Sequence, residues 1–420
     1  MRRMVLVCVL GICLFASLGI AAEARKSKND SLSDAALVEC ADRMWEVTWE
    51  RFYLPQTHLF YDYLTSYEPG RELAHLPTAD EVARQYPNEC GYGTGMEDCM
   101  ISAGVMLSLI VDRYAVTKEE SLRQRALDVF KGIELCVTVH GVPGFVARGV
   151  CPEDLKGTYP NSSRDQYTHA VHGLWLYFHS PLCSPEIQEK IGTILSAIAD
   201  RMTRNVTPEN DYDSLRSDGT RDTRGISRMW NVDGHEAARL PMIYAAAWDV
   251  TKKQEYYDLY RKYVEAAVEQ SFTVKDWCPT YAWLQMQGSL ELLASLGQDA
   301  ELKQKMGQIM AMVAKRCASR AANANKAAEK LDLTMLCSDW RTGEGLAWKG
   351  HYRKVWYCIR ESGEAALAQL MIDKTGLPKE QQQFLTQAMM RLDCKRVSSN
   401  GIFYLQAAYW KARRQADTAE

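Results

Sequence analysis

The sequence has 420 residues, of which 47% are apolar, so the chain can bury a large core and does not have the composition of a disordered protein. The formal net charge is only -3, and the lysines and arginines are scattered along the chain. This pattern argues against nucleic acid as a partner, because proteins that bind nucleic acid present a basic stripe or face.

The N-terminus predicts a secretory signal peptide. Two arginines come near its start, an apolar run follows as far as Ile20, and Ala22-Glu23-Ala24 provides small residues for cleavage. An uncleaved membrane anchor is the alternative, but the run is short for a spanning helix and ends in small residues. We therefore expect residues 1–24 to be removed. Residues 25–420 are then predicted to form one catalytic domain without a membrane span, in the periplasm or outside the cell.

The cysteines do not suggest a metal site. Two of the 13 precede Ile20, and the remaining eleven show no CxxC pair and no zinc-ribbon spacing. Most of them fall inside apolar helical segments, where cysteine is a small core residue. One or two disulfides would be compatible with an oxidising compartment.

Helical periodicity dominates the rest of the chain, and two kinds of predicted helix alternate along it. Helices of the first kind carry one apolar stripe, which is typical of a helix with a solvent-facing side. They are predicted near residues 35–53, 118–137, 184–204, 253–271, 299–318 and 378–393. Helices of the second kind are apolar on nearly all sides and must therefore be surrounded. They are predicted near residues 97–115, 164–179, 235–250, 277–296, 352–374 and 401–414.

This alternation predicts an all-α fold, a single-domain (α/α)6 toroid of six outer-inner helical hairpins. The striped helices would form the outer ring and the apolar helices the inner ring. An open superhelical stack of hairpins is the alternative, but we find no repeat motif of fixed period in the sequence.

The predicted connections differ in length according to which helix follows. Long connections precede inner helices, at residues 54–96, 138–163, 205–234 and 319–351, and short connections precede outer helices. All the long loops therefore gather on the rim where the inner helices begin. Sites are usually built on such loops, and helix N-termini there favour anions.

Two carboxylates at this rim are candidates for acid–base catalysis. Asp98 and Asp165 occupy matching places at the starts of neighbouring inner helices. Paired carboxylates suit glycoside chemistry, in which one group donates a proton and the other activates water or attacks. The alternative is that both acids cap their helices. For Asp165 we favour catalysis, because Arg164 and Gln166 flank it in an otherwise apolar helix.

Aromatic residues near the rim are candidates for stacking on sugar rings. Trp230, Trp340 and Trp348 lie in polar loops, where a large aromatic side chain usually has a binding role. Tyr404 lies one turn into the last inner helix. The alternative is that these side chains belong to the core.

Arginines at the rim indicate an acidic sugar. A guanidinium binds a carboxylate through two parallel hydrogen bonds, and Arg164, Arg341 and Arg353 are placed to do so. Ion pairs with the many loop aspartates are the alternative explanation.

Histidines supply the remaining candidates. His235 follows Asp233-Gly234 and is a candidate for proton transfer or substrate contact, and His351 is a candidate substrate contact. His169 and His172 have helical i, i+3 spacing without a third ligand, so we expect no metal. No phosphate loop or dinucleotide fingerprint occurs, and we expect no cofactor.

With its six hairpins placed, the chain resembles the (α/α)6-barrel glycosidases of the unsaturated glucuronyl and unsaturated rhamnogalacturonyl hydrolase group. The resemblance covers most of residues 35–415 and is mainly architectural. It implies that Asp165, in Ser163-Arg164-Asp165-Gln166-Tyr167, is the general acid/base and that Asp98 is the second carboxylate. Gln166, His169 and His172 depart from the hydrophobic run usual in that group, so a uronidase acting on saturated sugar is an equal alternative.

The leading hypothesis is therefore an exported glycoside hydrolase that acts on uronic-acid-containing oligosaccharides. A polysaccharide lyase on the same barrel, with Tyr404, Tyr352 or His235 as the base, is the second hypothesis. A non-catalytic glycan-binding protein is the third.

Overall fold

The computed structural model describes residues 35–297, 299–338, 341, 351–372 and 376–417. The predicted signal peptide, residues 1–24, lies outside these ranges. Helices dominate the described chain, as the periodicity predicts. The strands within these ranges form one short antiparallel hairpin of β1 (Tyr53–Leu54) and β2 (Leu59–Phe60), in which Tyr53 pairs with Phe60.

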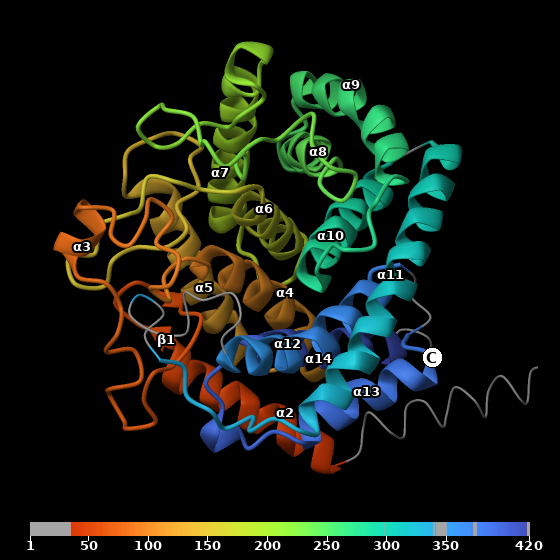
Figure 1. Ribbon diagram of the computed structural model, residues 1–420. Helices are drawn as coiled ribbons and strands as arrows, with labels where there is room; N and C mark the ends of the chain where they lie inside the picture. The colour runs from red at the N-terminus through yellow and green to blue at the C-terminus, as the bar shows by residue number, and fades with distance from the viewer. Residues whose placement is uncertain (1–34, 298, 339–340, 342–350, 373–375, 418–420) are drawn as a thin grey trace, which may run out of the picture.

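The two predicted kinds of helix form two concentric layers (Figure 1). The outer helices are α2 (Ala35–Val47), α5 (Ser121–Thr138), α7 (Pro185–Asn205), α9 (Gln254–Ser271), α11 (Ala300–Ala328) and α13 (Lys379–Met390). The inner helices are α4 (Cys99–Thr117), α6 (Arg164–Phe178), α8 (Arg239–Thr251), α10 (Thr280–Leu296), α12 (His351–Leu370) and α14 (Gly401–Asp417). Short elements complete the description: π-helix η1 (Thr48–Phe52), α3 (Ala79–Ala83), η2 (Pro208–Asn210) and η4 (Cys394–Arg396).

The inner layer is a closed ring. Each inner helix packs against the next along the chain, and α14 packs against α4, so the last hairpin joins the first. The prediction of a single-domain (α/α)6 toroid is confirmed, and the open superhelical stack is wrong.

Burial explains which helices lie inside. Every residue of α4 from Cys99 to Arg113 is buried. In α7 the buried residues lie mainly on one stripe that includes Ile187, Ile191 and Ile198, and the rest of its surface faces solvent. Helix α4 is also long and apolar enough to cross a membrane, but 83% of its most apolar window is buried within the protein, so packing in the ring accounts for its composition.

Two inner helices approach so closely that their backbones touch. A Cβ atom on Gly104 of α4 would collide with the carbonyl oxygen of His169 in α6. A Cβ atom on Gly173 of α6 would lie 2.8 Å from the Cα atom of Gly104. Glycine at both positions therefore sets the spacing of α4 and α6.

Helix α11 is longer than predicted. The prediction ended it at residue 318, whereas the helix continues to Ala328. The added segment is rich in alanine, which favours helix but supplies a weak apolar stripe, so its periodicity was hard to recognise. Ala321, Ala324 and Ala328 are nevertheless buried against the core.

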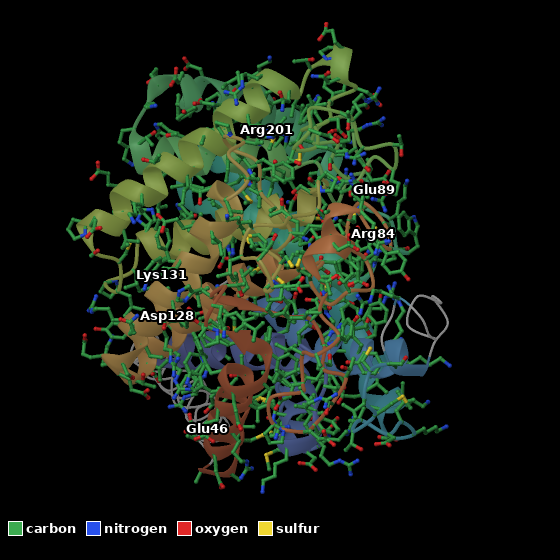
Figure 2. The ribbon with its side chains drawn as sticks, turned by 90° about the vertical axis from the view of Figure 1, so that its left-hand side faces the viewer. Glu46, Arg84, Glu89, Asp128, Lys131 and Arg201 are labelled. Carbon is green, nitrogen blue, oxygen red and sulfur yellow. The ribbon has the colours of Figure 1, made fainter. Side chains whose placement is uncertain are left out.

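Long connections precede the inner helices α4, α6 and α8, at residues 61–98, 139–163 and 206–238. In the side view of Figure 2, Arg84 and Glu89 from the first of these loops lie toward one edge of the molecule. Asp128 and Lys131 of outer helix α5 lie toward the opposite edge. The loops thus meet at the end where the inner helices begin, as the sequence predicts.

Candidate active site

A cavity of about 510 Å³ opens at the rim where the inner helices begin. Its wall is built from the N-terminal parts of α4, α6, α10 and α12 and from the loops that precede α4, α6 and α8. The lining residues include Asp62, Tyr92, Glu97, Asp98, Arg148, Asp165, Arg224, Tyr281, Gln285, Arg353, Trp356, Tyr357 and Arg360.

Asp98 enters this cavity from the N-cap position of α4. Its side chain makes no capping hydrogen bond to the helix, so the capping explanation does not account for it. The Nε2 atom of Gln166 donates to Asp98 Oδ1 over 2.9 Å, and Arg148 lies 3.4 Å from the same oxygen. Gln166 is fully buried, so its amide fixes the orientation of this carboxylate.

Asp165 enters the cavity from the first turn of α6. Its Oδ1 atom accepts a hydrogen bond from the Nη1 atom of Arg239, a residue of α8. The Nη2 atom of Arg239 donates to Gln285 Oε1 over 2.7 Å. Arg239 is 1% exposed and lies behind the cavity wall, where it holds the lining residues Asp165 and Gln285 in place.

The two aspartates have opposite pKa shifts. Burial raises the pKa of Asp98, the Arg148 charge lowers it, and the negative charge of Asp165 raises it, with a net increase. Burial also raises the pKa of Asp165, but Arg239, Arg164 and Arg148 outweigh burial and the net shift is downward. About a third of each side chain, 30% and 32%, faces the cavity. Relative to a free carboxyl group, Asp98 is thus shifted toward the protonated form and Asp165 toward the ionised form.

Two further carboxyl groups line the same wall. Glu97 accepts the backbone N–H groups of Gly93 and Gly95 over 2.9 and 2.6 Å, which fixes the loop before α4. Burial, and then the Asp98 charge, raises the pKa of Glu97 to about 7. Burial also raises the pKa of Asp62 well above its usual range, and Asn400 donates to Asp62 over 3.2 Å.

Four arginines line the cavity: Arg148, Arg224, Arg353 and Arg360. Arg360 is 5% exposed, donates to the Tyr404 hydroxyl over 2.9 Å, and lies over the Trp356 ring at 4.1 Å. Three of the four lining carboxyl groups have raised pKa values, which weakens their negative charge beside the arginines. Arg360 also pairs with the buried Glu364 over 2.8 Å, and Arg224 pairs with Glu89 over 3.2 Å. The cavity is therefore suited to an anionic group beside aromatic surface.

Several of the residues selected from the sequence meet here. Asp98, Asp165 and Arg353 line the cavity. Gln166 lies directly behind Asp98, and Tyr404 lies behind Arg360.

Other selected residues lie elsewhere and do not line this cavity. Arg164 donates to Glu236 over 2.8 Å and to two backbone carbonyls of the loop before α8, so it organises that loop. Trp230 packs against Tyr263 with ring centroids 4.7 Å apart, at the outer layer. Arg341 binds Glu81 and the His75 carbonyl.

His235 is 7% exposed, and its Nδ1 atom lies 3.4 Å from Cys278 Sγ, outside the lining of this cavity. Trp340 and Trp348 lie outside the described residues, as does the side chain of His351, which begins α12.

The sequence analysis missed Asp62, Arg239 and Arg360. The two arginines carried a usable signal, since each is a charged residue inside a helix that is otherwise apolar. Asp62 carried no such signal, because it lies in a long loop and its sequence neighbours do not predict the path of that loop.

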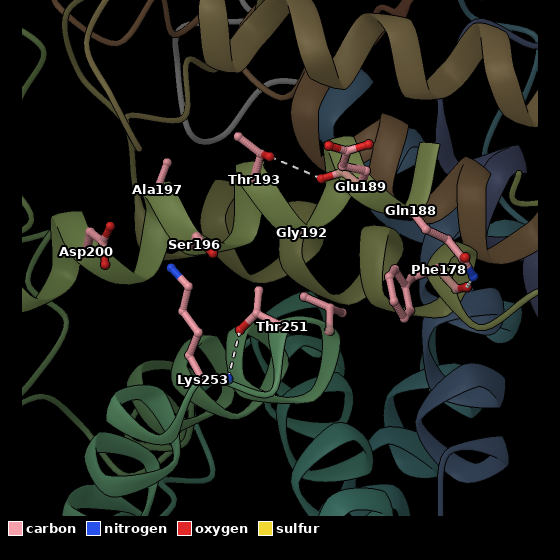
Figure 3. Close-up of a pocket in the computed structure, with 11 residues that line it drawn as sticks. Phe178, Gln188, Glu189, Gly192, Thr193, Ser196, Ala197, Asp200, Thr251 and Lys253 are labelled. Atoms are coloured by element: carbon pink, nitrogen blue, oxygen red, sulfur yellow. Dashed lines mark hydrogen bonds between the residues drawn. The ribbon is translucent and has the colours of Figure 1, made fainter. Parts of the chain in front are cut away.

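A second cavity, of about 660 Å³, lies between α7 and the turn that joins α8 to α9 (Figure 3). Its polar side chains make local hydrogen bonds, such as Thr193 Oγ1 to the Glu189 carbonyl and the Lys253 N–H to Thr251 Oγ1. The half-buried aspartate pair lies in the first cavity, and we place the candidate active site there.

No protein-family model matches the sequence, and no curated protein matches it. Solved structures do share its fold. The cellobiose 2-epimerase from Spirochaeta thermophila DSM 6192 is 13% identical with a TM-score of 0.50, over 95% of this chain and 98% of that one. A sugar epimerase from a ruminal bacterium is 11% identical with a TM-score of 0.48, over 92% of this chain and 98% of that one. The GH76A α-1,6-mannanase from Salegentibacter sp. HEL1_6 is 11% identical with a TM-score of 0.43, over 89% and 98%. At 13% identity, the similarity to the Spirochaeta thermophila enzyme shows the fold alone.

Proposed function

We propose that the protein is a carbohydrate-active enzyme, a glycoside hydrolase that acts on uronic-acid-containing oligosaccharides. The observation that carries this proposal is the pair Asp98 and Asp165, whose pKa values shift in opposite directions within one cavity. Hydrolysis of a glycoside needs one carboxyl group that holds a proton and one that has lost it. The fold shared with the Spirochaeta thermophila cellobiose 2-epimerase supports a role in sugar chemistry.

The two aspartates take separate roles in this proposal. Asp98, protonated, donates its proton to the glycosidic oxygen as the bond to the leaving sugar breaks. Asp165, ionised, activates the water or attacks the sugar from the other side. Arg239 holds Asp165 in its charged form, and Gln166 holds Asp98 in position.

An acidic sugar is the substrate that the charge of the cavity favours. Arg353 and Arg360 border the cavity on the α12 side, next to Trp356 and Tyr357. A sugar carboxylate pairs with the guanidinium groups, while the apolar face of the ring stacks on the aromatic side chains. A lyase would need a basic tyrosine here, but burial and the nearby Asp165 charge raise the pKa of Tyr281, which opposes that role.

The test is an activity screen with paired glycans. Each uronic-acid oligosaccharide is offered beside its neutral counterpart to the purified mature protein, and release of reducing ends and near-ultraviolet absorbance are followed together. Hydrolysis releases reducing ends without new absorbance, whereas a lyase creates absorbance. Turnover with Asp165→Asn or Asp98→Asn should fall by roughly 10²–10⁴, because each change removes a proton-transfer group. The melting temperature of Asp165→Asn should fall, because the buried Arg239 loses its anionic partner, so activity is compared at a temperature where both variants are folded.

Asp218→Asn is the matched control. Asp218 is an exposed acid in the loop before α8 and accepts from the Thr220 N–H over 2.9 Å. This variant should keep its activity. Near-normal turnover by Asp165→Asn would remove the proposed mechanism, and binding of glycans without any turnover would show a non-catalytic carbohydrate-binding protein.

A further inference from the structure

One large aromatic side chain on the loop rim is strongly exposed. Trp277 is 63% exposed, and it lies in the turn between α9 and α10, just before α10 begins. The indole offers a flat apolar face to a ligand, and burial of that face against a sugar ring would be favourable. The side chain is not used by the aspartate pair or by the wall around it.

The residues around Trp277 hold it in place. The ring of the buried His235 meets it edge to face, with centroids 6.0 Å apart and an interplanar angle of 77°. Lys275 Nζ lies 5.9 Å from the indole centroid and 2.8 Å from Asp233 Oδ1. His235, a candidate from the sequence, thus packs against the indole and supports it.

A polar cavity of about 850 Å³ lies near Trp277. The indole does not itself line this cavity, but Asp233, which pairs with Lys275 over 2.8 Å, does. Asp233 and Glu236 line it, and these two acids flank His235 in the chain. The loop before α8 forms most of the remaining wall. Arg224 lines both this cavity and the one that holds the aspartate pair, so the two cavities are neighbours along the same rim.

The charge of this cavity differs from that of the first. Its lining holds five carboxylates, Asp211, Asp213, Asp222, Asp233 and Glu236, and four arginines, Arg164, Arg221, Arg224 and Arg228. Ion pairs such as Arg164–Glu236 and Arg221–Asp211 largely balance these charges, so the cavity has little net attraction for a sugar carboxylate. Carboxylate oxygens can accept hydrogen bonds from sugar hydroxyl groups. The cavity is therefore suited to a neutral sugar.

We propose that Trp277 and this cavity form a distal subsite that binds neutral sugar units of the same glycan whose acidic sugar occupies the first cavity. The proposal rests on the proposed function, since it assumes that the first cavity binds a sugar. The indole stacks on the C–H face of a sugar ring, and Asp233 and Glu236 accept from its hydroxyl groups. The substrate is then a mixed oligosaccharide long enough to extend past Arg224.

Calorimetry tests this subsite. A series of mixed neutral and uronic oligosaccharides of increasing length is titrated into the full mature protein carrying Asp165→Asn, which is the parent variant. Adding Trp277→Ala should raise Kd about tenfold for the longest member. The ratio of the Kd of the double variant to the Kd of the Asp165→Asn parent should grow with the length of the oligosaccharide. Phe272→Ala is the matched control, because Phe272 is a second exposed aromatic (39%) and lies at the start of the same turn, before Lys275 and Trp277. Its Kd values should stay those of the Asp165→Asn parent.

Three outcomes overturn the subsite: equal Kd values with and without Trp277→Ala, an equal loss at every chain length, or no glycan binding by the parent. A further outcome also overturns the subsite: the wild-type protein is a dimer, Trp277→Ala is a monomer, and the change in Kd does not depend on oligosaccharide length. Trp277 would then be an interface residue. Length-dependent glycan binding in a protein that hydrolyses nothing keeps the subsite and rejects the hydrolase.

Discussion

At the scale of single residues, the difference between Asp98 and Asp165 depends on which buried cation each contacts. Arg239 is directly hydrogen-bonded to Asp165, whereas Arg148 reaches Asp98 at 3.4 Å and also donates to the Tyr92 hydroxyl and the Glu97 carbonyl. Among these contacts, Asp165 is therefore the only anionic partner of Arg239, whereas Asp98 shares Arg148 with the Tyr92 hydroxyl and the Glu97 carbonyl. A closer and less divided positive charge stabilises the ionised form more strongly.

Arg239→Met should shift the pH profile of the enzyme. The guanidinium lowers the pKa of Asp165, so its loss raises that pKa and protonates the base at a higher pH. The acidic limb of kcat/KM should therefore move to higher pH, while the alkaline limb, assigned to Asp98, should move much less. Arg239→Lys keeps the charge and should move the acidic limb less than Arg239→Met. A fall in stability with an unmoved acidic limb would show that Arg239 supports only the fold.

At the scale of helices, the contact between α4 and α6 has the tightest geometric requirement that we find in the ring. Gly104 and Gly173 allow the two backbones to touch, which places Asp98 and Asp165 at the adjacent starts of these helices. The spacing of the proposed catalytic pair thus depends on two glycines about two turns deeper in the ring.

Gly104→Ala should destabilise the protein by about 1–3 kcal/mol, because the added methyl group meets the His169 carbonyl and forces α4 and α6 apart. Gly307→Ala is the matched control, since Gly307 lies within α11 and has no atom within 4 Å of the position of its added Cβ. It should stabilise by about 0.4–1 kcal/mol through helix propensity and lower unfolded-state entropy. Denaturant unfolding of both variants decides this, and a neutral Gly104→Ala would show that the helix contact is adjustable.

At the scale of the whole molecule, the closed ring depends on the packing of α14 against α4 and α12. The described chain begins at residue 35, the first residue of outer helix α2. Removal of residues 1–24 would therefore leave every described helix intact. Export remains our proposal for this segment, with the mature protein in the periplasm or outside the cell.

Intact-mass measurement of the protein from its natural host tests export. The order of positive charge, apolar run and small residues predicts a mature N-terminus between Ala22 and Lys28. A protein that begins at Met1 would exclude cleavage. Recovery of the cleaved form from the envelope fraction or the medium, with a cytoplasmic marker protein absent, is the expected result.

The sequence by itself determined the architecture. Whether a helix is apolar on one side, as α7 is, or on nearly all sides, as α4 is, depends on its own residues, so the two layers could be assigned by periodicity alone. The same local information placed Asp98 and Asp165 at the starts of inner helices, and Arg353 near the start of another. It also identified the loop-bearing rim.

Only the tertiary structure decided what these residues face. Arg239 is 74 positions from Asp165 along the chain, and Asn400 is 338 positions from Asp62, so no spacing rule relates them. Their meeting depends on how each inner helix is rotated and on where the ring closes, and both are set by packing among all the helices together. Because helix rotation cannot be read from the sequence, Arg164, Trp230 and His235 were predicted to lie with the two aspartates. Packing places them along the neighbouring loop and the outer layer instead. The pKa values of the two aspartates follow from these contacts, because charge and burial act through space rather than along the chain.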